Sequence, residues 1–216
     1  MQLYYNPLST YSQKVLIALY EKNVPFTPEL VNLMSPEGAA AYQALYPLGK
    51  LPLLKPTPDY MIPESTIIIE FLEGHYPNQG TRLIPEGVDP SRQVRFMDRM
   101  SDLYLNDPAA LLLFQQFGFA QHTDAALDKA RRQLTISYGH FDKRLSSSEW
   151  LCGAFSIADC AAIPPLFYAQ IVAPFGNYPN LTRYFERAQK RASYAKVMAE
   201  FLPMWNNMQT PQSAVA

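Results

Sequence analysis

Strand-like and helix-like patterns of apolar residues alternate over residues 1–76 of the chain. The first apolar run, Gln2–Tyr5, ends at an Asn-Pro pair and predicts a short strand. The following segment, Tyr11–Lys22, carries apolar residues three and four positions apart, which predicts an amphipathic helix. The chain is therefore expected to begin with a strand and a helix that packs on it.

Five further elements are predicted before residue 77. A second strand covers Phe26–Val31, and a short helix follows with Ser35 as its N-cap and Pro36 in its first turn. Two more strands fit the runs "KLPLLK" and "DYMI". A helix with a strongly apolar face fits "ESTIIIEFLEGHY", in which Ser65 is the natural N-cap. The order βαβαββα predicts a small α/β domain over residues 1–77.

The rest of the chain predicts a second domain of a different kind. Residues 78–90 are rich in Pro, Gly and polar residues and are expected to form a linker. Residues 91–208 show helical periodicity throughout, which predicts an all-α domain. A restart is expected at Asp107–Pro108, because Asp is a good N-cap and Pro fits the first turn of a helix. The polar residues 209–216 lack periodicity and are expected to fray.

The overall composition limits the classes of function. The chain is 48% hydrophobic and 17% charged, which is ordinary for a globular protein. A net charge of −1 gives no electrostatic reason to expect nucleic acid or an anionic membrane as a partner. Two cysteines, no signal-like N-terminus and no apolar run of about 20 residues predict a soluble, cytoplasmic protein. The three histidines share no metal-ligand spacing with the cysteines, so no metal is expected.

Several hydroxyl groups gather where the first strand gives way to the first helix. Ser9 and Ser12 are three residues apart, and Tyr5 ends the strand. Such hydroxyls can cap a helix, or they can hold a reactive atom against the positive end of the helix dipole. Residue types alone leave both interpretations open. By contrast, Ser156 and Asp159 have the spacing of a capping box, which is interpreted as a purely structural helix start.

Four motifs, in this order and at these spacings, make the chain resemble the cytosolic glutathione S-transferase superfamily over nearly its whole length. They are "NPLSTYSQKV" after the first strand, "YPLGKLPLL" from Tyr46, "PESTIIIEFLE" from Pro63 and "FSIADCAA" from Phe155. The resemblance implies a thioredoxin-like N-terminal domain joined to an all-α C-terminal domain. It also implies a serine-type active site that uses glutathione as co-substrate without a metal.

The resemblance assigns the binding of glutathione to residues of the N-terminal domain. It implies a cis peptide bond between Leu51 and Pro52, with the backbone of Leu51 paired to the cysteinyl part of glutathione. Ser65 would hold the γ-glutamyl carboxylate at the start of a helix, where free N–H groups favour an anion, and Glu64 would help to place the γ-glutamyl group. The stretch "NLMSPE" offers no cation for the glycine carboxylate, unlike many serine-type members. Either Lys50 takes that role, or glutathione binds more weakly or in a shifted pose.

The implied chemistry is attack of the glutathione thiolate on an electrophilic carbon. A free cysteine thiol has a pKa of about 8.5, so the protein must favour the anion, as a hydroxyl donor and a helix N-terminus both do. Ser9 has the sequence offset of the activating serine in serine-type members and is the first candidate. Tyr5, Ser12, Thr10 or a backbone donor are the alternatives.

The resemblance further implies a second substrate and a second subunit. The substrate is expected to be a small, largely apolar electrophile bound between the domains. Met97, Met100, Tyr104 and Phe114 on the long helical segment would line such a pocket. Met and aromatic residues at helical spacing more often belong to the core, so none of them is assigned to the site. Family members are usually homodimers, in which Asp98 or Asp102 could reach across toward the γ-glutamyl ammonium.

Other functions of the same fold stay open. They are a glutathione-dependent isomerase or peroxidase, and a non-catalytic adaptor that binds a protein partner. A thiol–disulfide oxidoreductase is disfavoured, because such an enzyme would carry Cys where this chain has Ser9 and often also where it has Ser12.

Overall fold

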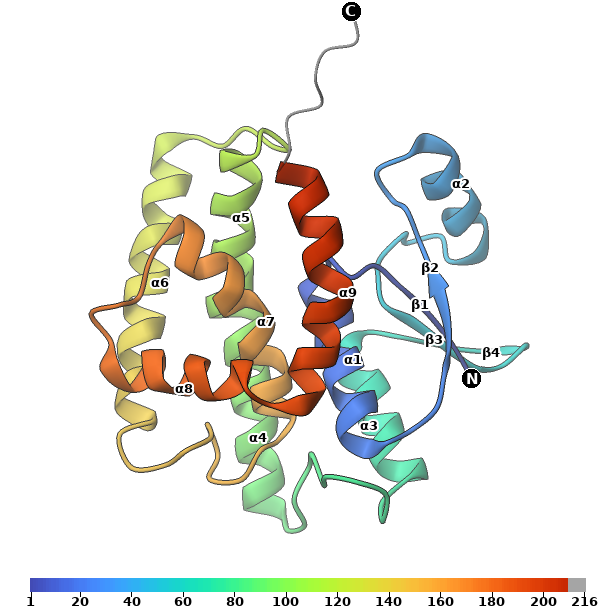
Figure 1. Ribbon diagram of the computed structural model, residues 1–216, viewed down its shortest axis with the longest axis horizontal. Coiled ribbons are helices and arrows are strands. Elements are labelled where there is room, and N and C mark those ends of the chain that lie inside the picture. Colours follow the sequence, from blue (N-terminus) through green and yellow to red (C-terminus); the bar gives the residue numbers. More distant parts are fainter. Residues whose placement is uncertain (210–216) are drawn as a thin grey trace, which may run out of the picture.

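The computed structural model describes residues 1–209, which form a small α/β unit followed by a unit built of helices (Figure 1). The sheet of the first unit has the strand order β2-β1-β3-β4. Strand β1 (Gln2–Tyr5) runs parallel to β2 (Thr27–Leu30), and β3 (Leu53–Thr57) runs antiparallel to both β1 and β4 (Tyr60–Pro63). A helix supplies the crossover that the parallel pair requires, whereas a tight turn joins β3 to β4.

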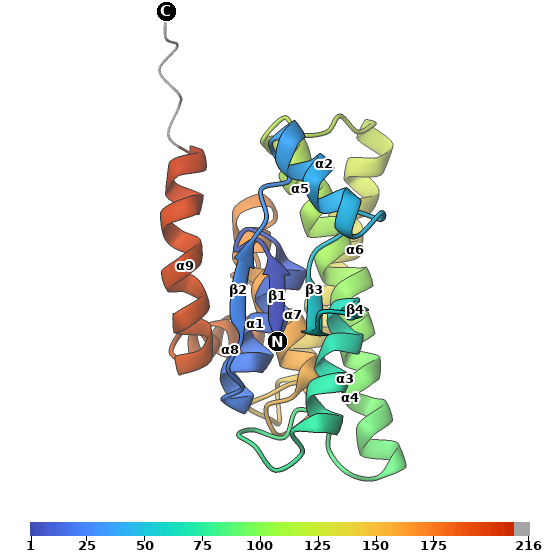
Figure 2. The same ribbon diagram turned by 90° about the vertical axis from the view of Figure 1, so that its right-hand side faces the viewer.

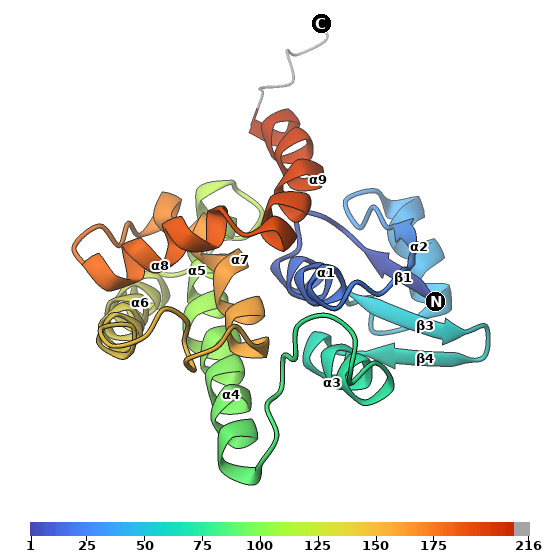
Figure 3. The same cartoon turned by 60° about the horizontal axis from the view of Figure 1, so that its bottom comes forward.

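Three helices complete the first unit: α1 (Thr10–Lys22), α2 (Pro36–Leu45) and α3 (Ser65–His75). Helices α1 and α3 pack together on the side of the sheet that faces the second unit, while α2 lies apart from them (Figures 2 and 3). The apolar face of α1 is buried because it lies between the sheet and the second unit. The predicted order βαβαββα and the thioredoxin-like fold class are confirmed.

The start of α3 differs from the prediction. The sequence predicts Ser65 as the N-cap, but this is wrong, because Glu64 occupies that position and Ser65 is the first helical residue. Glu64 has a φ of 69°, and no side chain caps the helix. Since β4 ends at Pro63, the chain must turn from strand into helix within one residue, and a left-handed φ makes that turn.

The second unit is all-α over the described residues, as predicted. Its helices are α4 (Val88–Ser101), α5 (Asp107–Gln116), α6 (Asp124–Arg144), α7 (Ile157–Val172), α8 (Pro179–Gln189) and α9 (Ala192–Gln209). Helix α4 begins within the segment expected as a linker, because Pro90 fits its first turn. Helix α9 includes Gln209, and the rest of the tail expected to fray lies outside the described residues. Within residues 1–209, no helix is long and apolar enough to cross a membrane.

Helix α7 is the centre of the second unit. It packs against α1, α4 and α5, and most of its side chains are buried. The predicted capping box holds its start, because the Asp159 carboxylate accepts from the Ser156 N–H at 2.9 Å. The same carboxylate accepts from the Leu151 N–H at 3.0 Å and the Tyr184 hydroxyl at 3.1 Å, so it also fixes the preceding loop. This motif therefore belongs to the folding core, away from the pocket described below.

A π-helical segment, Asp102–Asn106, joins α4 to α5. The predicted restart lies where α5 begins, at Asp107, but Asp107 is not the N-cap: Asn106 holds that position, both residues keep helical dihedral angles, and no side chain caps this start. Pro108 has no N–H for the carbonyl four residues before it and its ring crowds that carbonyl, so a wider turn relieves the mismatch. The interruption is thus a local widening of one long helix.

Side chains of α6 bond the carbonyl groups that this widening frees. The Leu103 carbonyl accepts from the Gln133 side chain at 3.1 Å, and the Tyr104 carbonyl accepts from the Ser137 hydroxyl at 2.6 Å. Kinks at proline persist where side chains insert into the hydrogen-bond ladder in this way. As a result, Asp102 at the start of the π-helical segment lies where α4 meets the first unit.

Candidate active site

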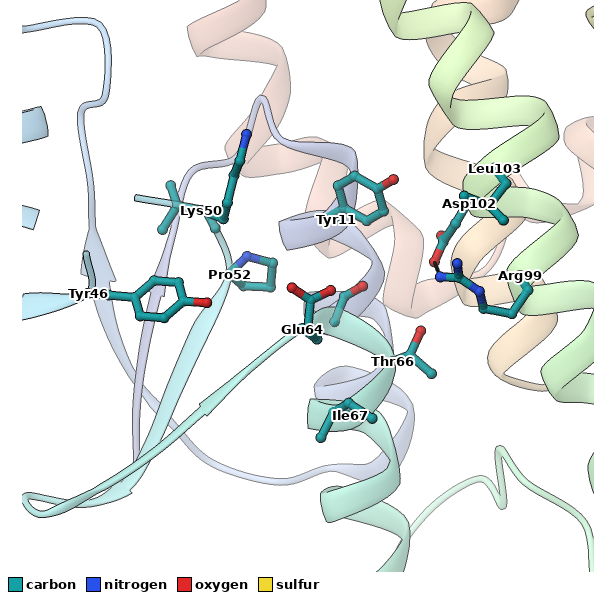
Figure 4. Close-up of a pocket in the computed structure, with 12 residues that line it drawn as sticks. Tyr11, Tyr46, Lys50, Pro52, Glu64, Thr66, Ile67, Arg99, Asp102 and Leu103 are labelled. Atoms are coloured by element: carbon teal, nitrogen blue, oxygen red, sulfur yellow. Dashed lines mark ion pairs between the residues drawn. The ribbon is translucent and has the colours of Figure 1, made fainter. Parts of the chain in front are cut away.

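A pocket with a volume of about 460 Å³ opens where the two units meet (Figure 4). Its walls are the first turn of α1, the segment before β3, the start of α3 and the junction of α4 with the π-helical segment. The lining residues are Tyr11, Tyr46, Lys50, Leu51, Pro52, Glu64, Ser65, Thr66, Ile67, Arg99, Asp102 and Leu103. Among residues 1–209, no three or more His, Cys, Asp or Glu side chains are grouped so as to hold a metal ion.

The segment before β3 is held so that its backbone faces the pocket. The Leu51–Pro52 peptide bond is cis, as the resemblance implies. Gly49 takes a φ of 62° in the turn that precedes it, a conformation that favours glycine. The Tyr42 hydroxyl donates to the carbonyl of Lys50 at 2.8 Å and ties this segment to α2. The backbone of Leu51 is thereby presented at the pocket wall.

The pairing of β3 with β4 brings the start of α3 beside this segment. Leu53 lies opposite Pro63, so the preceding residue Pro52 lies near the following residue Glu64. Glu64 is an exposed residue whose carboxylate points into the pocket (Figure 4). Ser65 is only 5% exposed, at the first position of the helix. The N–H groups of a first helical turn have no carbonyl partner within the helix, so this wall can bind an anion.

The strained conformation of Glu64 is itself informative. A non-glycine residue with positive φ costs on the order of 1–3 kcal/mol and is retained only where the surroundings enforce it. Here the strain aims a carboxylate into the pocket next to the positive end of a helix. Such a pair of opposite charges fits a ligand group that carries both a carboxylate and an ammonium.

The first candidate for thiol activation lies at the start of α1. Ser9 is the N-cap of this helix, and its Oγ accepts from the Ser12 N–H at 3.2 Å. Its hydroxyl hydrogen stays available for donation, because a serine hydroxyl can accept and donate at once. Ser9 is partly exposed but is not among the residues that line the pocket, whereas Tyr11 in the same turn is. The role of Ser9 stays a prediction.

The structure does not bring two of the alternative hydroxyls, those of Tyr5 and Ser12, to the pocket. Tyr5 is 3% exposed, and its hydroxyl donates to Glu200 of α9 at 2.6 Å. Burial, reinforced by this hydrogen bond, raises the pKa of Tyr5 far above its ordinary value. Ser12 is fully buried, and its Oγ accepts from the Asn6 N–H at 3.3 Å. Both alternatives are corrected accordingly, since each side chain faces the protein interior.

The wall formed by the second unit is polar. The Asp102 carboxylate lines the pocket and accepts from the buried Lys14 ammonium of α1 at 2.9 and 3.2 Å. Lys14 is also 2.6 Å from Asp98, and it donates to the Thr66 hydroxyl at 2.9 Å. Burial, opposed by the attraction of Lys14, raises the pKa of Asp102 to about 6. One cation thus serves two carboxylates directly behind the pocket wall.

The apolar residues expected on this wall lie elsewhere. Met97 is fully buried in the core, and Met100 and Tyr104 line a separate groove between α4 and α6. Phe114 is 47% exposed and packs edge-on against Phe119. The prediction of these four side chains as pocket residues is therefore wrong. Met97 and Met100 lie in α4 before the π-helical segment, so their positions follow from how α4 packs against α7.

Several pocket residues were not identified from the sequence. They are Tyr11, Tyr46, Thr66, Ile67, Arg99 and Leu103. Tyr11, Tyr46, Thr66 and Ile67 stand within the quoted motifs, but no role was assigned to them there. No signal in the sequence singles out Arg99, because its place depends on how α4 packs against α3.

Two family models match the chain in the order of its two units. The model described as "Glutathione S-transferase, N-terminal domain" matches residues 3–80, and that described as "Glutathione S-transferase, C-terminal domain" matches residues 102–192. The chain belongs to the glutathione S-transferase superfamily. The resemblance found in its four sequence motifs is thereby confirmed.

Two relatives of this glutathione S-transferase superfamily chain match nearly its whole length at low identity, and a third matches part of it. Glutathione S-transferase hmp2 of Hypomyces subiculosus is 27% identical over 215 residues, which cover 93% of this chain and 98% of the relative. A crystal structure of a Methylobacillus flagellatus glutathione S-transferase with GSH bound is 29% identical, with a TM-score of 0.78, and the match covers 91% of this chain and 98% of that one. Elongation factor 1-gamma of Carassius auratus is 26% identical over 74% of this chain but only 36% of its own length.

Proposed function

We propose that the protein is a glutathione transferase, which joins the thiolate of glutathione to small, largely apolar electrophiles. The observation that carries this proposal is the convergence of the Leu51–Pro52 backbone, the Glu64–Ser65 helix start and Lys50 on one pocket at the N-terminal end of α1. Membership of the superfamily and the GSH-bound relative of similar fold support it.

Each polar group of glutathione has a complementary partner on the wall of the first unit. The γ-glutamyl carboxylate would accept from Ser65 and the N–H groups of the first turn of α3, and Glu64 would accept from the neighbouring ammonium. The backbone of Leu51 would pair with the cysteinyl amide as in a short antiparallel strand. Lys50, an exposed cation with no ion pair among the described residues, would hold the glycine carboxylate.

In this pose the cysteinyl sulfur would lie toward the N-terminus of α1, with the Ser9 hydroxyl as the donor that favours the thiolate. The thiol first loses its proton to solvent, and the sulfur then forms a bond to the electrophilic carbon. In a substitution the leaving halide departs with the electron pair, and in an addition to an enone the adjacent carbon takes up a proton. The hydroxyl and the helix dipole stabilise the anion without taking its proton.

The proposal is tested by titrating the ultraviolet absorbance of the bound thiolate against pH. Bound to the wild type, the thiol is expected to titrate about two units below free glutathione. In Ser9→Ala, the pKa of the bound thiol should rise most of the way back to that of free glutathione. A wild type that binds no glutathione, or binds it with an unshifted thiol, would contradict transferase activity and would leave the adaptor function as the better account.

A matched control separates loss of a helix cap from loss of the sulfur donor. Ser35 is the N-cap of α2, where its Oγ accepts from the Gly38 N–H at 2.9 Å, away from the pocket. Ser9→Ala and Ser35→Ala should each lower the free energy of unfolding by about 1 kcal/mol. Only Ser9→Ala should shift the thiol titration. If Tyr11→Phe shifts the titration and Ser9→Ala does not, the hydroxyl donor is Tyr11 and the assignment to Ser9 is wrong.

Two further expectations from the resemblance remain part of this proposal. They are a homodimer and a cytoplasmic location. Sedimentation or light scattering of the purified protein measures the first, and a monomer at micromolar concentration would contradict it.

A further inference from the structure

Arg99 of α4 brings to the pocket wall a cation that forms an ion pair with Asp102 but no hydrogen bond to a described residue. Its side chain is 59% exposed, and no described residue accepts a hydrogen bond from it. Its nearest carboxylate oxygen is on Asp102 at 4.0 Å, which is too far for a hydrogen bond. By contrast, Arg191 gives Glu21 two hydrogen bonds of 2.6 and 2.7 Å. The guanidinium of Arg99 therefore keeps its donors free for a ligand.

The neighbour of Arg99 is already engaged by another cation. Asp102 accepts two hydrogen bonds from Lys14, which is itself 1% exposed and cannot reach the pocket. Asp102 is thus oriented from behind, by the first unit, and does not depend on Arg99 for a hydrogen-bonded partner. Figure 4 shows the Arg99 side chain on the wall opposite Lys50, with Glu64 between them.

Under the proposed function, glutathione leaves this cation unused. Its two carboxylates are matched by Ser65 and Lys50, and its ammonium by Glu64, all on the side of the first unit. The electrophile must approach the sulfur from the remaining side, where Arg99 is the cation in the lining. The lining also holds two exposed apolar side chains that offer apolar contact, Ile67 of α3 and Leu103 next to Asp102, which are 51% and 39% exposed.

We infer that the second substrate carries a carboxylate, which Arg99 binds while the apolar body of the substrate packs on Ile67 and Leu103. The inference rests on the proposed function and specifies the substrate class. A planar guanidinium suits a carboxylate because it can form two parallel hydrogen bonds. Arg99 is then a residue that determines specificity, and it takes no part in activating the thiol.

Two glutathione conjugates test the inference by binding alone. S-benzylglutathione and S-(4-carboxybenzyl)glutathione differ only in the carboxylate, and calorimetry gives the dissociation constant of each. The wild type should bind the carboxylated probe at least tenfold more tightly. Arg99→Gln should remove that preference and leave the affinity for S-benzylglutathione within twofold. Arg99→Lys, which keeps the charge but loses the paired geometry, should fall between them.

The control variant is Arg92→Gln on the same helix. Arg92 is a 69% exposed arginine paired with Asp89 and lies outside the pocket. It should change the affinity for neither probe, which excludes a general effect of positive charge on α4. Added salt should weaken binding of the carboxylated probe by the wild type more than by Arg99→Gln, because an exposed ion pair is screened.

The outcomes separate failure of the inference from failure of the proposed function. A wild type that binds both probes equally, or an Arg99→Gln variant that loses affinity for both alike, overturns the inference and leaves the transferase function standing. A wild type that binds neither probe nor glutathione overturns both.

Enzymatic turnover provides a second test of whether Arg99 favours a carboxylated substrate. With 4-(chloromethyl)benzoate and its methyl ester, the sulfur–carbon bond forms as chloride leaves, so the two reactions differ only in the remote group. Arg99→Gln should lower kcat/KM about tenfold for the acid, mainly through KM, because the lost contact is remote from the reacting carbon. The ester should be unaffected, and an equal loss for both substrates would contradict the inference.

Discussion

Helix α1 buries Lys14 near its start and Glu21 near its end, and these two of its buried charges are partnered in different ways. Lys14 lies behind the pocket, where one ammonium serves the carboxylates of Asp98 and Asp102. Glu21 lies two turns further along, where each carboxylate oxygen accepts two hydrogen bonds. Both clusters join the two units. One is short of positive charge and borders the pocket, whereas the other is balanced and distant from it.

The balanced cluster has the features of a purely structural contact. Glu21 accepts from Arg191, Ser193 and Thr81 at 2.5 to 2.7 Å. The Arg191 guanidinium also lies 3.7 Å from the centre of the Phe155 ring. Every polar atom of the carboxylate is therefore satisfied, and the cation is covered on one face. The cluster distant from the pocket is thus the one in which every polar atom of the buried carboxylate has a hydrogen-bond partner.

The largest effect is expected at Lys14. Lys14→Met leaves two buried carboxylates without their cation, so it should lower the free energy of unfolding by about 3–5 kcal/mol. Urea denaturation measures this loss. Adding Asp98→Asn to Lys14→Met should recover part of it, because the repulsion between the carboxylates is then removed. The exposed control Lys143→Met should stay within about 0.5 kcal/mol of the wild type. A loss at Lys14 no larger than that of the control would show that the cluster contributes nothing.

A smaller loss is expected at the other end of the helix. Glu21→Gln removes the charge that binds Arg191, and the free energy of unfolding should fall by about 2 kcal/mol, because Arg191 keeps its aromatic contacts and is partly exposed. Glu86→Gln, in the exposed pair with Arg82, is the matched control and should cost less than about 0.5 kcal/mol.

Glutathione binding tests whether the Glu21 cluster is independent of the pocket. Glu21→Gln should leave the dissociation constant for glutathione within twofold of the wild type, since Glu21 lies at the far end of α1 from the pocket. A clear loss of affinity would contradict the separation of a structural cluster from one that borders the site.

The two walls of the pocket also differ in how far they can be predicted from the sequence. The Leu51–Pro52 and Glu64–Ser65 positions are assigned by the family resemblance, and its motifs lie at a strand start and a helix start, which are visible in one sequence. The strands and helices themselves follow from apolar periodicity, which is why the predicted element order is confirmed. Details of a single residue, such as the N-cap of α3, depend on how tightly the chain turns between elements.

The wall of the second unit depends on contacts between distant parts of the chain. Tyr5 is buried in the main core, and its hydroxyl donates to Glu200 of α9, far away in the sequence. Arg99 and Asp102 reach the pocket because the C-terminal end of α4 and the start of the π-helical segment border the pocket opposite the start of α3. Periodicity in a straight helix predicts a different face, and no local pattern reports which end of a long helix meets another domain.

The smallest predicted effect is on the pH dependence of the free energy of unfolding, to which the two clusters contribute with opposite signs. Burial disfavours ionised Glu21, but the bonds from Arg191, Ser193 and Thr81 outweigh it and hold its pKa below the ordinary value. The native state then binds fewer protons than the unfolded chain, so this stabilisation is present above the unfolded pKa and is lost as pH falls through the native one.

Asp102 should act in the opposite direction. Burial raises its pKa from 3.8 to about 6, so the native state binds more protons between these values, and its contribution to stability falls as pH rises through that window. The measurement is the free energy of unfolding of the wild type minus that of each variant, from pH 4 to 7. For Glu21→Gln this difference should grow with pH, and for Asp102→Asn it should shrink. Parallel slopes would contradict the assignment of opposite electrostatic surroundings to the two ends of α1.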